Sequence, residues 1–375
     1  MSDLVLDSLE IKNFRAFKHL RIEHLGRVNL IVGKNNVGKS SVLEALWLYS
    51  VQGEPDILLR ILQRRNVIKR RDISEPVDEA TLLDDRLSSL RYLFYNYPDV
   101  KRDQRDSRSI QFGPVSSEEN AIRVTVCYIV REEGHFSAKF REIRPSDDIL
   151  SANVFYGLAI HIGLNPPTYV MLQNNILPRY LKDWHGLEPV NCFQLWSEGL
   201  TSDMTALLWD SIALTDAQGD VIAAMQIIAP GLMAINFVAG QGSGRIPIAK
   251  IANIEIPVPL LSLGEGMSRM FGIILALVNA KDGILLIDEV DTGLHYSVLP
   301  DLWKLIFEVA HRLNVQVFAT SHSWDCIQAF QLAADDNKEE EGVVIRLENR
   351  DGEVSPIIFD ERKLNIAVRE HIEVR

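Results

Sequence analysis

The chain has 375 residues, of which 47% are hydrophobic and 24% charged, as expected for a globular protein with a sizeable core. Its formal net charge of −12 argues against broad electrostatic coating of DNA or of an anionic membrane, although it leaves room for a local basic patch. No uncharged apolar run is long enough for a transmembrane helix, and the three cysteines form no C-x-x-C pair. We therefore expect a cytoplasmic protein without a membrane segment, a disulfide framework or a zinc site.

The first 50 residues predict a strand, a glycine-rich turn and a helix that together bind phosphate. The apolar run 28–32 ends at a glycine, and residues 42–46 have the apolar spacing of a helix. Between them, "GKNNVGKS" at 33–40 fits the pattern G-x-x-x-x-G-K-[ST] without a mismatch. The pattern predicts that backbone N–H groups cradle the β-phosphate, that Lys39 reaches the β- and γ-phosphates, and that Ser40 ligates Mg²⁺. The candidate nucleotide-binding residues are Gly33, Asn35, Asn36, Gly38, Lys39, Ser40 and Ser41.

A charge-segregated stretch follows and is predicted to be a helical insertion. Residues 60–71 carry basic side chains and no acid, whereas residues 72–85 carry acids and no base. The basic run, with Arg64, Arg65, Arg70 and Arg71, suits contacts to DNA phosphates. Pairing within the chain with the acids that follow is an equally good interpretation.

The middle of the chain predicts strands and then helices. Residues 120–130 and 136–143 alternate as the two strands of a hairpin, and 169–172 is predicted to be a buried strand. Residues 200–230 have a helical pattern, 240–244 is a glycine-rich connection, and the stretch after it alternates again.

From residue 262 onward, turns, helices and strands follow one another in the rhythm of an α/β protein. The pattern predicts a turn and helix (262–280), then strands at 284–288, 315–319 and 343–347 separated by helices at 297–312 and 324–334. Strands that alternate with helices in this way predict a mostly parallel central sheet.

Two of these apolar strands are followed by polar residues that can take part in catalysis or metal binding. Residues 284–287 are followed by Asp288 and Glu289, and 315–319 is followed closely by His322. Ligands bind at the carboxyl edge of parallel sheets. Asp288 is therefore a candidate Mg²⁺ ligand, Glu289 a candidate base for the attacking water, and His322 a candidate contact to the γ-phosphate.

Taken with "SLGEGMSRM" at 262–270, "LLIDEVDTGLH" and "FATSHSWDCI", these motifs resemble the ABC-type ATPase heads of the SMC and RecF families. The resemblance is closer to single-chain ATPases of the OLD family and covers both ends of the chain better than residues 55–200. It implies a P-loop head in which residues 1–55 and 255–375 form the ATPase core and 56–254 a helical and β insertion.

The resemblance also implies that two heads sandwich two ATP molecules, as a homodimer or a higher even-numbered oligomer. The signature turn (262–266) would then act on the ATP of the partner through Ser262, Gly264, Glu265 and Gly266. Asp291 and His295 would lie at the dimer interface, with helix capping as the alternative for both. Gln173 is the candidate for the glutamine that coordinates Mg²⁺ in such heads, against a surface glutamine.

Full-length OLD nucleases add a C-terminal Toprim domain, which needs an Asp-x-Asp pair for metals; because this sequence contains no such pair, we expect no Toprim domain in it. The resemblance therefore implies a sensor ATPase in antiphage defence whose effector, a nuclease, is a separate polypeptide. The alternative is a RecF-like ATPase of DNA repair or recombination that contacts DNA through 60–71. An ATPase subunit of a membrane transporter fits less well, because of the long insertion.

Overall fold

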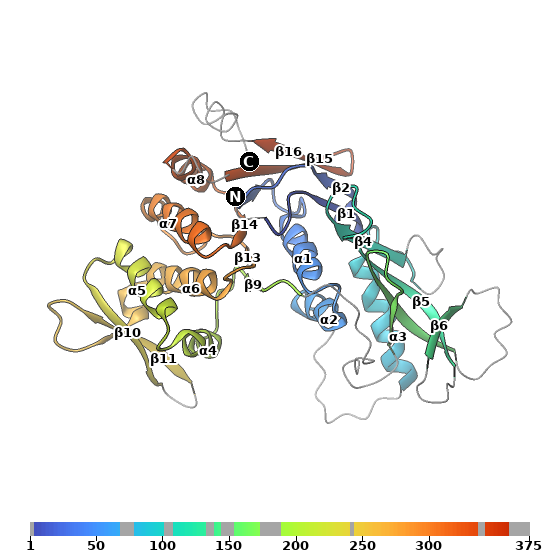
Figure 1. Cartoon of the computed structure of the whole chain (residues 1–375), viewed down its shortest axis with the longest axis horizontal. Coiled ribbons are helices and arrows are strands. Elements are labelled where there is room, and N and C mark those ends of the chain that lie inside the picture. Colours follow the sequence, from blue (N-terminus) through green and yellow to red (C-terminus); the bar gives the residue numbers. More distant parts are fainter. Residues whose placement is uncertain are drawn as a thin grey trace.

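The structure is a computed structural model that describes residues 4–67, 79–100, 108–132, 139–143, 154–172, 189–240, 244–336 and 342–359. Its strands form three sheets (Figure 1). A six-stranded sheet lies at the centre, a seven-stranded antiparallel sheet lies at one end of the molecule, and a three-stranded sheet lies at the other.

The central sheet has the strand order β16–β15–β3–β14–β13–β9, and its neighbours are parallel except for β16 and β15. The strands are β3 (Val28–Val32), β9 (Cys192–Leu195), β13 (Ile284–Ile287), β14 (Gln316–Thr320), β15 (Gly342–Arg350) and β16 (Glu353–Phe359). β3, β13 and β14 are buried along their whole length. Burial on both faces explains why these strands are continuous apolar runs. The predicted α/β fold with a mostly parallel sheet is confirmed.

Helices cover both faces of the central sheet. α1 (Lys39–Ser50) and α2 (Pro55–Arg64) lie on one face, and α6 (Glu265–Asn279), α7 (Leu299–Arg312) and α8 (Trp324–Asp336) lie on the other (Figure 1). Because side chains of a strand alternate between faces, Ile31 packs in the core beneath α1 and Leu30 in the core beneath α6 to α8. The helices that begin at the phosphate loop and at the signature turn therefore lie on opposite faces.

The antiparallel sheet has the order β2–β1–β4–β5–β7–β8, with β6 also paired to β5. Its strands are β1 (Leu9–Phe14), β2 (Phe17–Ile22), β4 (Ser109–Gly113), β5 (Ile122–Glu132), β6 (Lys139–Ile143), β7 (Val154–Ile162) and β8 (Thr168–Met171). β5 and β6 are the predicted hairpin. β8 is only half-buried, contrary to expectation, because it ends the sheet and has one neighbour. α3 (Glu79–Leu90) and a short 3₁₀ helix (Arg91–Leu93) precede β4.

The third unit combines two helices with a small sheet, as the pattern of residues 200–260 predicts. It contains α4 (Ser202–Ile212), α5 (Asp216–Ile228), β10 (Leu232–Ala239), β11 (Arg245–Ile251) and β12 (Val258–Pro259). The ring of Trp209 on α4 lies 6.1 Å from that of Phe237 on β10 and 5.9 Å from that of Phe271 on α6. This aromatic cluster fixes the unit to the signature helix. None of the helices in the described ranges combines the length and apolar character needed to cross a membrane.

Strand pairing crosses the border that the sequence suggests between core and insertion. β9 belongs to the stretch 56–254, yet it forms the edge of the central sheet beside β13. β1, from the N-terminal part of the core, pairs with β4 of the same stretch. The division into 1–55 with 255–375 and 56–254 stays a prediction, and these pairings show how closely its parts are joined.

A buried ion-pair cluster ties the N-terminal strands to α1 and α2. Glu44 on α1 is fully buried, with its carboxylate 2.8 Å from Arg15 Nε and 2.9 Å from Arg65 Nε. Burial lowers the pKa of Arg15 to about 10, although the neighbouring Glu44 acts in the opposite direction. Without the carboxylate, the buried Arg15 charge would be uncompensated.

Replacing Glu44 with alanine is therefore expected to lower the free energy of unfolding by about 3 kcal/mol or more, because breaking a buried pair leaves an isolated charge. Urea unfolding followed by circular dichroism measures this loss. The matched control is Glu23→Ala in the exposed Arg21–Glu23 pair, where we expect a change of about 1 kcal/mol or less. Equal losses of unfolding free energy in the two variants would contradict a stabilising role of the buried Glu44 ion pairs.

Candidate active site

Residues 33–38 form the turn between β3 and α1, as the phosphate-loop pattern predicts. Gly33 has φ +143°, and a Cβ atom there would lie 2.6 Å from the carbonyl oxygen of Leu347. Gly38 has φ +107°, which L side chains rarely adopt. Lys39 begins α1, and its Nζ donates to two carbonyls of the turn, the nearer being that of Gly33 at 2.8 Å. The turn and its lysine are therefore arranged around the N-terminus of α1.

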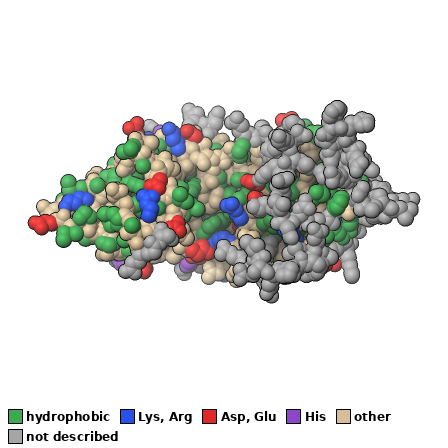
Figure 2. Space-filling model, turned by 90° about the horizontal axis from the view of Figure 1, so that it is seen from below, with side chains coloured by type: hydrophobic (Ala, Val, Ile, Leu, Met, Phe, Trp, Pro, Cys, Tyr) green, Lys and Arg blue, Asp and Glu red, His purple; other side chains and the backbone are tan. Residues whose placement is uncertain are grey.

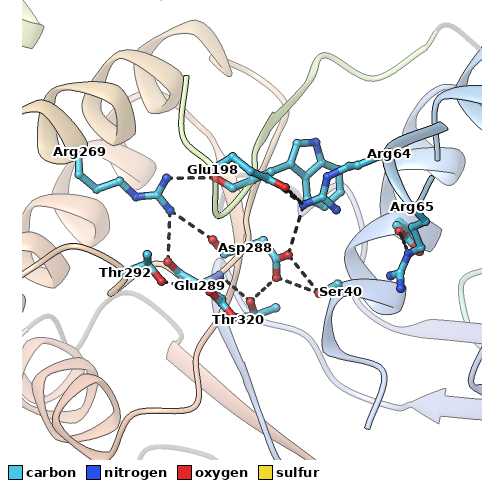
Figure 3. Close-up of polar contacts among 11 residues, drawn as sticks. Ser40, Arg64, Arg65, Glu198, Arg269, Asp288, Glu289, Thr292 and Thr320 are labelled. Atoms are coloured by element: carbon cyan, nitrogen blue, oxygen red, sulfur yellow. Dashed lines mark hydrogen bonds and ion pairs between the residues drawn. The ribbon is translucent and has the colours of Figure 1, made fainter. Parts of the chain in front are cut away.

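Asp288 is the centre of a hydrogen-bond network at the carboxyl edge of the central sheet (Figure 3). Ser40 Oγ lies 3.1 Å from both of its carboxylate oxygens, and Thr320 Oγ1 donates to Oδ1 at 2.7 Å. Thr320 Oγ1 also accepts the backbone N–H of Glu289 at 2.8 Å. Asp288 follows β13, Thr320 ends β14, and Ser40 lies at the start of α1. They meet because neighbouring parallel strands end at one edge of the sheet.

Glu289 has an unusual backbone for a non-glycine residue. Its φ is +50°, in the left-handed region. Such conformations cost on the order of 1–3 kcal/mol and persist where the surrounding structure holds them, commonly at active sites. Its half-buried side chain accepts a hydrogen bond of 3.1 Å from Thr292 Oγ1.

The signature turn lies away from this network. Ser262 belongs to a 3₁₀ helix (Leu260–Leu263), and Gly264, with φ +109°, precedes the first residue of α6, Glu265. Ser262, Gly264 and Glu265 are exposed. Among the residues that the structure describes, no hydrogen bond joins 262–266 to 33–41. The turn thus presents an exposed helix N-terminus that is not hydrogen-bonded to the phosphate loop within the described residues.

Two family models match the chain in the regions that form this site. The model described as an AAA ATPase domain matches residues 5–149, which contain the phosphate loop. The model described as "AAA domain, putative AbiEii toxin, Type IV TA system" matches residues 249–325, which contain the signature turn, Asp288 and Glu289.

Known proteins agree with these matches. An ATP/GTP phosphatase of Helicobacter pylori is 22% identical over 347 residues, covering 86% of this chain and 87% of that protein. A stretch of 45 residues is 47% identical to the DNA replication and repair protein RecF of Clostridioides difficile, covering 12% of each chain. The crystal structure of an SMC head bound to the C-winged helix domain of ScpA has a TM-score of 0.51 at 13% identity, over 96% of this chain and 99% of that one. These matches show an ATPase, and its fold is similar to that of an SMC head.

The residues around Asp288 suit the Mg²⁺ ion that P-loop ATPases use. Such enzymes hold Mg²⁺ through the hydroxyl that follows the loop lysine and through an aspartate at a strand end, which are here Ser40 and Asp288. In the described part of the ATPase, no three His, Cys, Asp or Glu residues cluster around a potential metal position. Ser40 and Asp288, 3.1 Å apart, offer one hydroxyl and one carboxylate, and nucleotide phosphates and water would supply the other ligands of the ion.

Basic side chains balance the acids at the sheet edge. Burial lowers the pKa of Lys39 from its ordinary value, although Glu289, Asp288 and Asp291 act to raise it. Burial likewise lowers the pKa of Arg269, again opposed by these acids. The ATPase thus keeps two partly buried cations where nucleotide phosphates would add negative charge.

Of the four other predicted site residues, three lie in the described part of the structure and one does not. His322 is exposed two residues beyond β14, at the same sheet edge as Asp288. Asp291 is half-buried, and its Oδ1 has no hydrogen-bond partner among the described residues. His295 caps a 3₁₀ helix (Tyr296–Val298), because its Nδ1 accepts the backbone N–H of Ser297 at 3.3 Å; this is the capping alternative. Gln173 lies outside the described residues.

Arg64 occupies a place that its neighbours in the sequence do not indicate. Its Nη2 lies 3.2 Å from Glu198 Oε2 and 3.9 Å from Asp288 Oδ2, and its guanidinium stacks 3.8 Å from the ring centroid of Trp196 (Figure 3). Partial burial raises the pKa of Glu198, but a hydrogen bond to its own backbone, together with Arg64 and Arg269, outweighs burial, so the net shift is downward. Arg64 and Glu198 reach the site because α2 and the residues after β9 flank the sheet edge.

The structure tests the DNA interpretation of residues 60–71 at some of the arginines but not at others. Arg64 and Arg65 are paired within the chain, with Glu198 and with the buried Glu44. Arg70 and Arg71 lie outside the described residues. Intramolecular pairing, the alternative interpretation of the basic run, therefore accounts for Arg64 and Arg65, although their partners are not the acids that follow in sequence.

Proposed function

We propose that two copies of the ATPase face each other and close around two ATP molecules, each held by the phosphate loop of one copy and the signature turn of the other. The observation that carries this proposal is the placement of α1 and α6 on opposite faces of the central sheet. Ser262, Gly264, Glu265 and Gly266 then contact the γ-phosphate bound to the partner. The N-terminus of α6 favours that negative charge.

Within each composite site, the sheet-edge residues divide the chemistry. Lys39 binds the β- and γ-phosphates, while Ser40 and Asp288 hold Mg²⁺, which neutralises phosphate charge when bound. Glu289 orients and deprotonates the attacking water, and His322 contacts the γ-phosphate. Asp291 and His295, in the turn after Glu289, lie near the partner copy.

We further propose that ATP-driven closure controls a separate effector, a nuclease that acts in antiphage defence. The resemblance to OLD-family ATPases and the family model described as a putative AbiEii toxin support this output. The three-stranded unit also exposes large apolar side chains, a feature typical of protein-binding surfaces. They are Met204, Leu207, Met233, Val238 and Ile246, and apolar side chains are frequent at the corresponding end of the molecule in Figure 2.

If each active site needs two copies, specific ATPase activity should rise with protein concentration at saturating ATP. We expect a fall of about 10-fold or more when the enzyme is diluted well below its dimer dissociation constant. The measurement is steady-state phosphate release across a dilution series, paired with light scattering. Specific activity that stays constant while the scattering mass halves would rule out the composite site.

The effector proposal has its own test. The product of the neighbouring gene, if it is a nuclease, should co-purify with the tagged ATPase in ATP and be lost from a Lys39→Ala variant. If the nuclease co-purifies equally with and without ATP, and equally with the Lys39→Ala variant, control by ATP would be contradicted.

The alternative function is a RecF-like clamp on duplex DNA, favoured by the 45-residue similarity to RecF. Lys and Arg side chains on the face shown in Figure 2 are scattered among apolar and acidic ones. ATP-dependent retention on duplex DNA that weakens steeply with salt would support this alternative over the effector model.

A further inference from the structure

Arg269 links the signature helix to the catalytic turn. It lies one turn into α6, four residues after Glu265. Its Nη2 donates to the backbone carbonyl oxygens of Asp288 and Glu289, both at 3.2 Å (Figure 3). Its Nη1 donates at 3.0 Å to the carbonyl oxygen of Trp196, just after β9. One side chain therefore joins three carbonyls from two different loops.

Two of those carbonyls, of Asp288 and Glu289, belong to a turn that needs external support. Glu289 has φ +50°, and its backbone N–H is held by Thr320. Arg269 holds the other side of the same residue through its carbonyl. Strained conformations persist when several contacts determine them together. A planar guanidinium can hold several carbonyls at fixed angles, whereas the single ammonium of lysine cannot.

We propose that Arg269, although it lies in the signature helix, is a positioning residue for Glu289 of its own chain. It keeps the carboxylate where it can orient the attacking water and takes no part in contacting the ATP held by the partner. This inference rests on the proposed division of each active site between two copies. A displacement of about 1 Å at a reacting group can lower a rate on the order of 100-fold.

Arg269→Lys keeps the positive charge and removes the planar guanidinium, whose N–H groups point in fixed directions. We expect kcat to fall by about 10- to 100-fold while the dissociation constant for ATP changes by about two-fold or less. The matched control is Arg27→Lys. Arg27 is also buried and donates to the side chain of Asn314 at 3.3 Å and the carbonyl oxygen of Val315 at 3.5 Å, but it precedes β3 at the opposite edge of the sheet. Its kcat should change by about two-fold or less. An Arg269→Lys enzyme with normal kcat would overturn the proposal.

Mixed dimers show which chain Arg269 serves. A chain with Ser262→Arg keeps its phosphate loop, and a chain with Lys39→Ala keeps its signature turn. Each is expected to be inactive alone, and mixing them should restore hydrolysis at one composite site, whose Glu289 comes from the Ser262→Arg chain. Failure to restore activity while Arg269 is intact would argue against the divided site itself.

Arg269→Lys is then added to one chain at a time. Our proposal predicts that it removes most of the restored activity when placed in the Ser262→Arg chain and little when placed in the Lys39→Ala chain. The reverse pattern would show that Arg269 serves the signature turn. An equal loss in both chains, or a large drop in melting temperature, would show a general structural role. Either result would overturn the proposal.

Discussion

Glu289→Gln is expected to slow ATP hydrolysis by about 10²- to 10⁴-fold, the usual contribution of a general base. The amide keeps the shape of the side chain but cannot accept a proton from water. Lys39, Ser40 and Asp288 are unchanged, so ATP binding should persist. Because hydrolysis no longer opens the sandwich, the variant should accumulate as a nucleotide-bound dimer.

Light scattering with and without ATP, together with phosphate release, measures both effects. The matched control is Glu308→Gln, an exposed glutamate on α7 away from the sheet edge, which should behave like the unmodified ATPase. A Glu289→Gln protein with the same mass in the presence and absence of ATP would disprove the closing model.

Ser262→Arg should leave ATP binding intact and reduce turnover by about 100-fold or more, comparable to the loss of a group that stabilises transition-state charge. Ser262 is exposed at the start of the signature helix, so a longer side chain fits in the isolated chain. At a closed interface, the same side chain would occupy the space of the partner's γ-phosphate.

Nucleotide titration followed by fluorescence, and phosphate release, separate binding from turnover. Ser355→Arg provides a control with the same substitution at an exposed serine. Ser355 lies on β16, the outer strand of the central sheet on the side away from β9. Loss of ATP binding in Ser262→Arg would show that the turn serves the nucleotide of its own chain.

Local sequence patterns predicted those parts of the site that depend on neighbouring residues. A phosphate loop needs glycine at left-handed or crowded positions and a lysine at the start of the helix, and these requirements are visible in "GKNNVGKS". The approach of Asp288 to Ser40 was also predictable, because parallel strands that alternate with helices end at a common sheet edge.

The parts that depend on pairing between distant segments were not predictable in this way. β9 is only four residues long, and nothing in its sequence shows that it lies beside β13. That pairing carries Glu198 to the site, where α2 brings Arg64 to meet it. As a result, Arg64, whose charge pattern suited either DNA contacts or pairing within the chain, pairs with Glu198 and lies 3.9 Å from Asp288.

The sequence by itself determined the α/β fold, the phosphate loop and the strand that ends in Asp288 and Glu289, because each depends on short-range periodicity or on steric demands within a few residues. The tertiary structure alone decided that the signature turn lies on the opposite face from the phosphate loop, and that Arg269 reaches back to the carbonyl of Glu289. Both facts depend on how helices pack across a sheet, and this packing joins residues that are far apart in the chain.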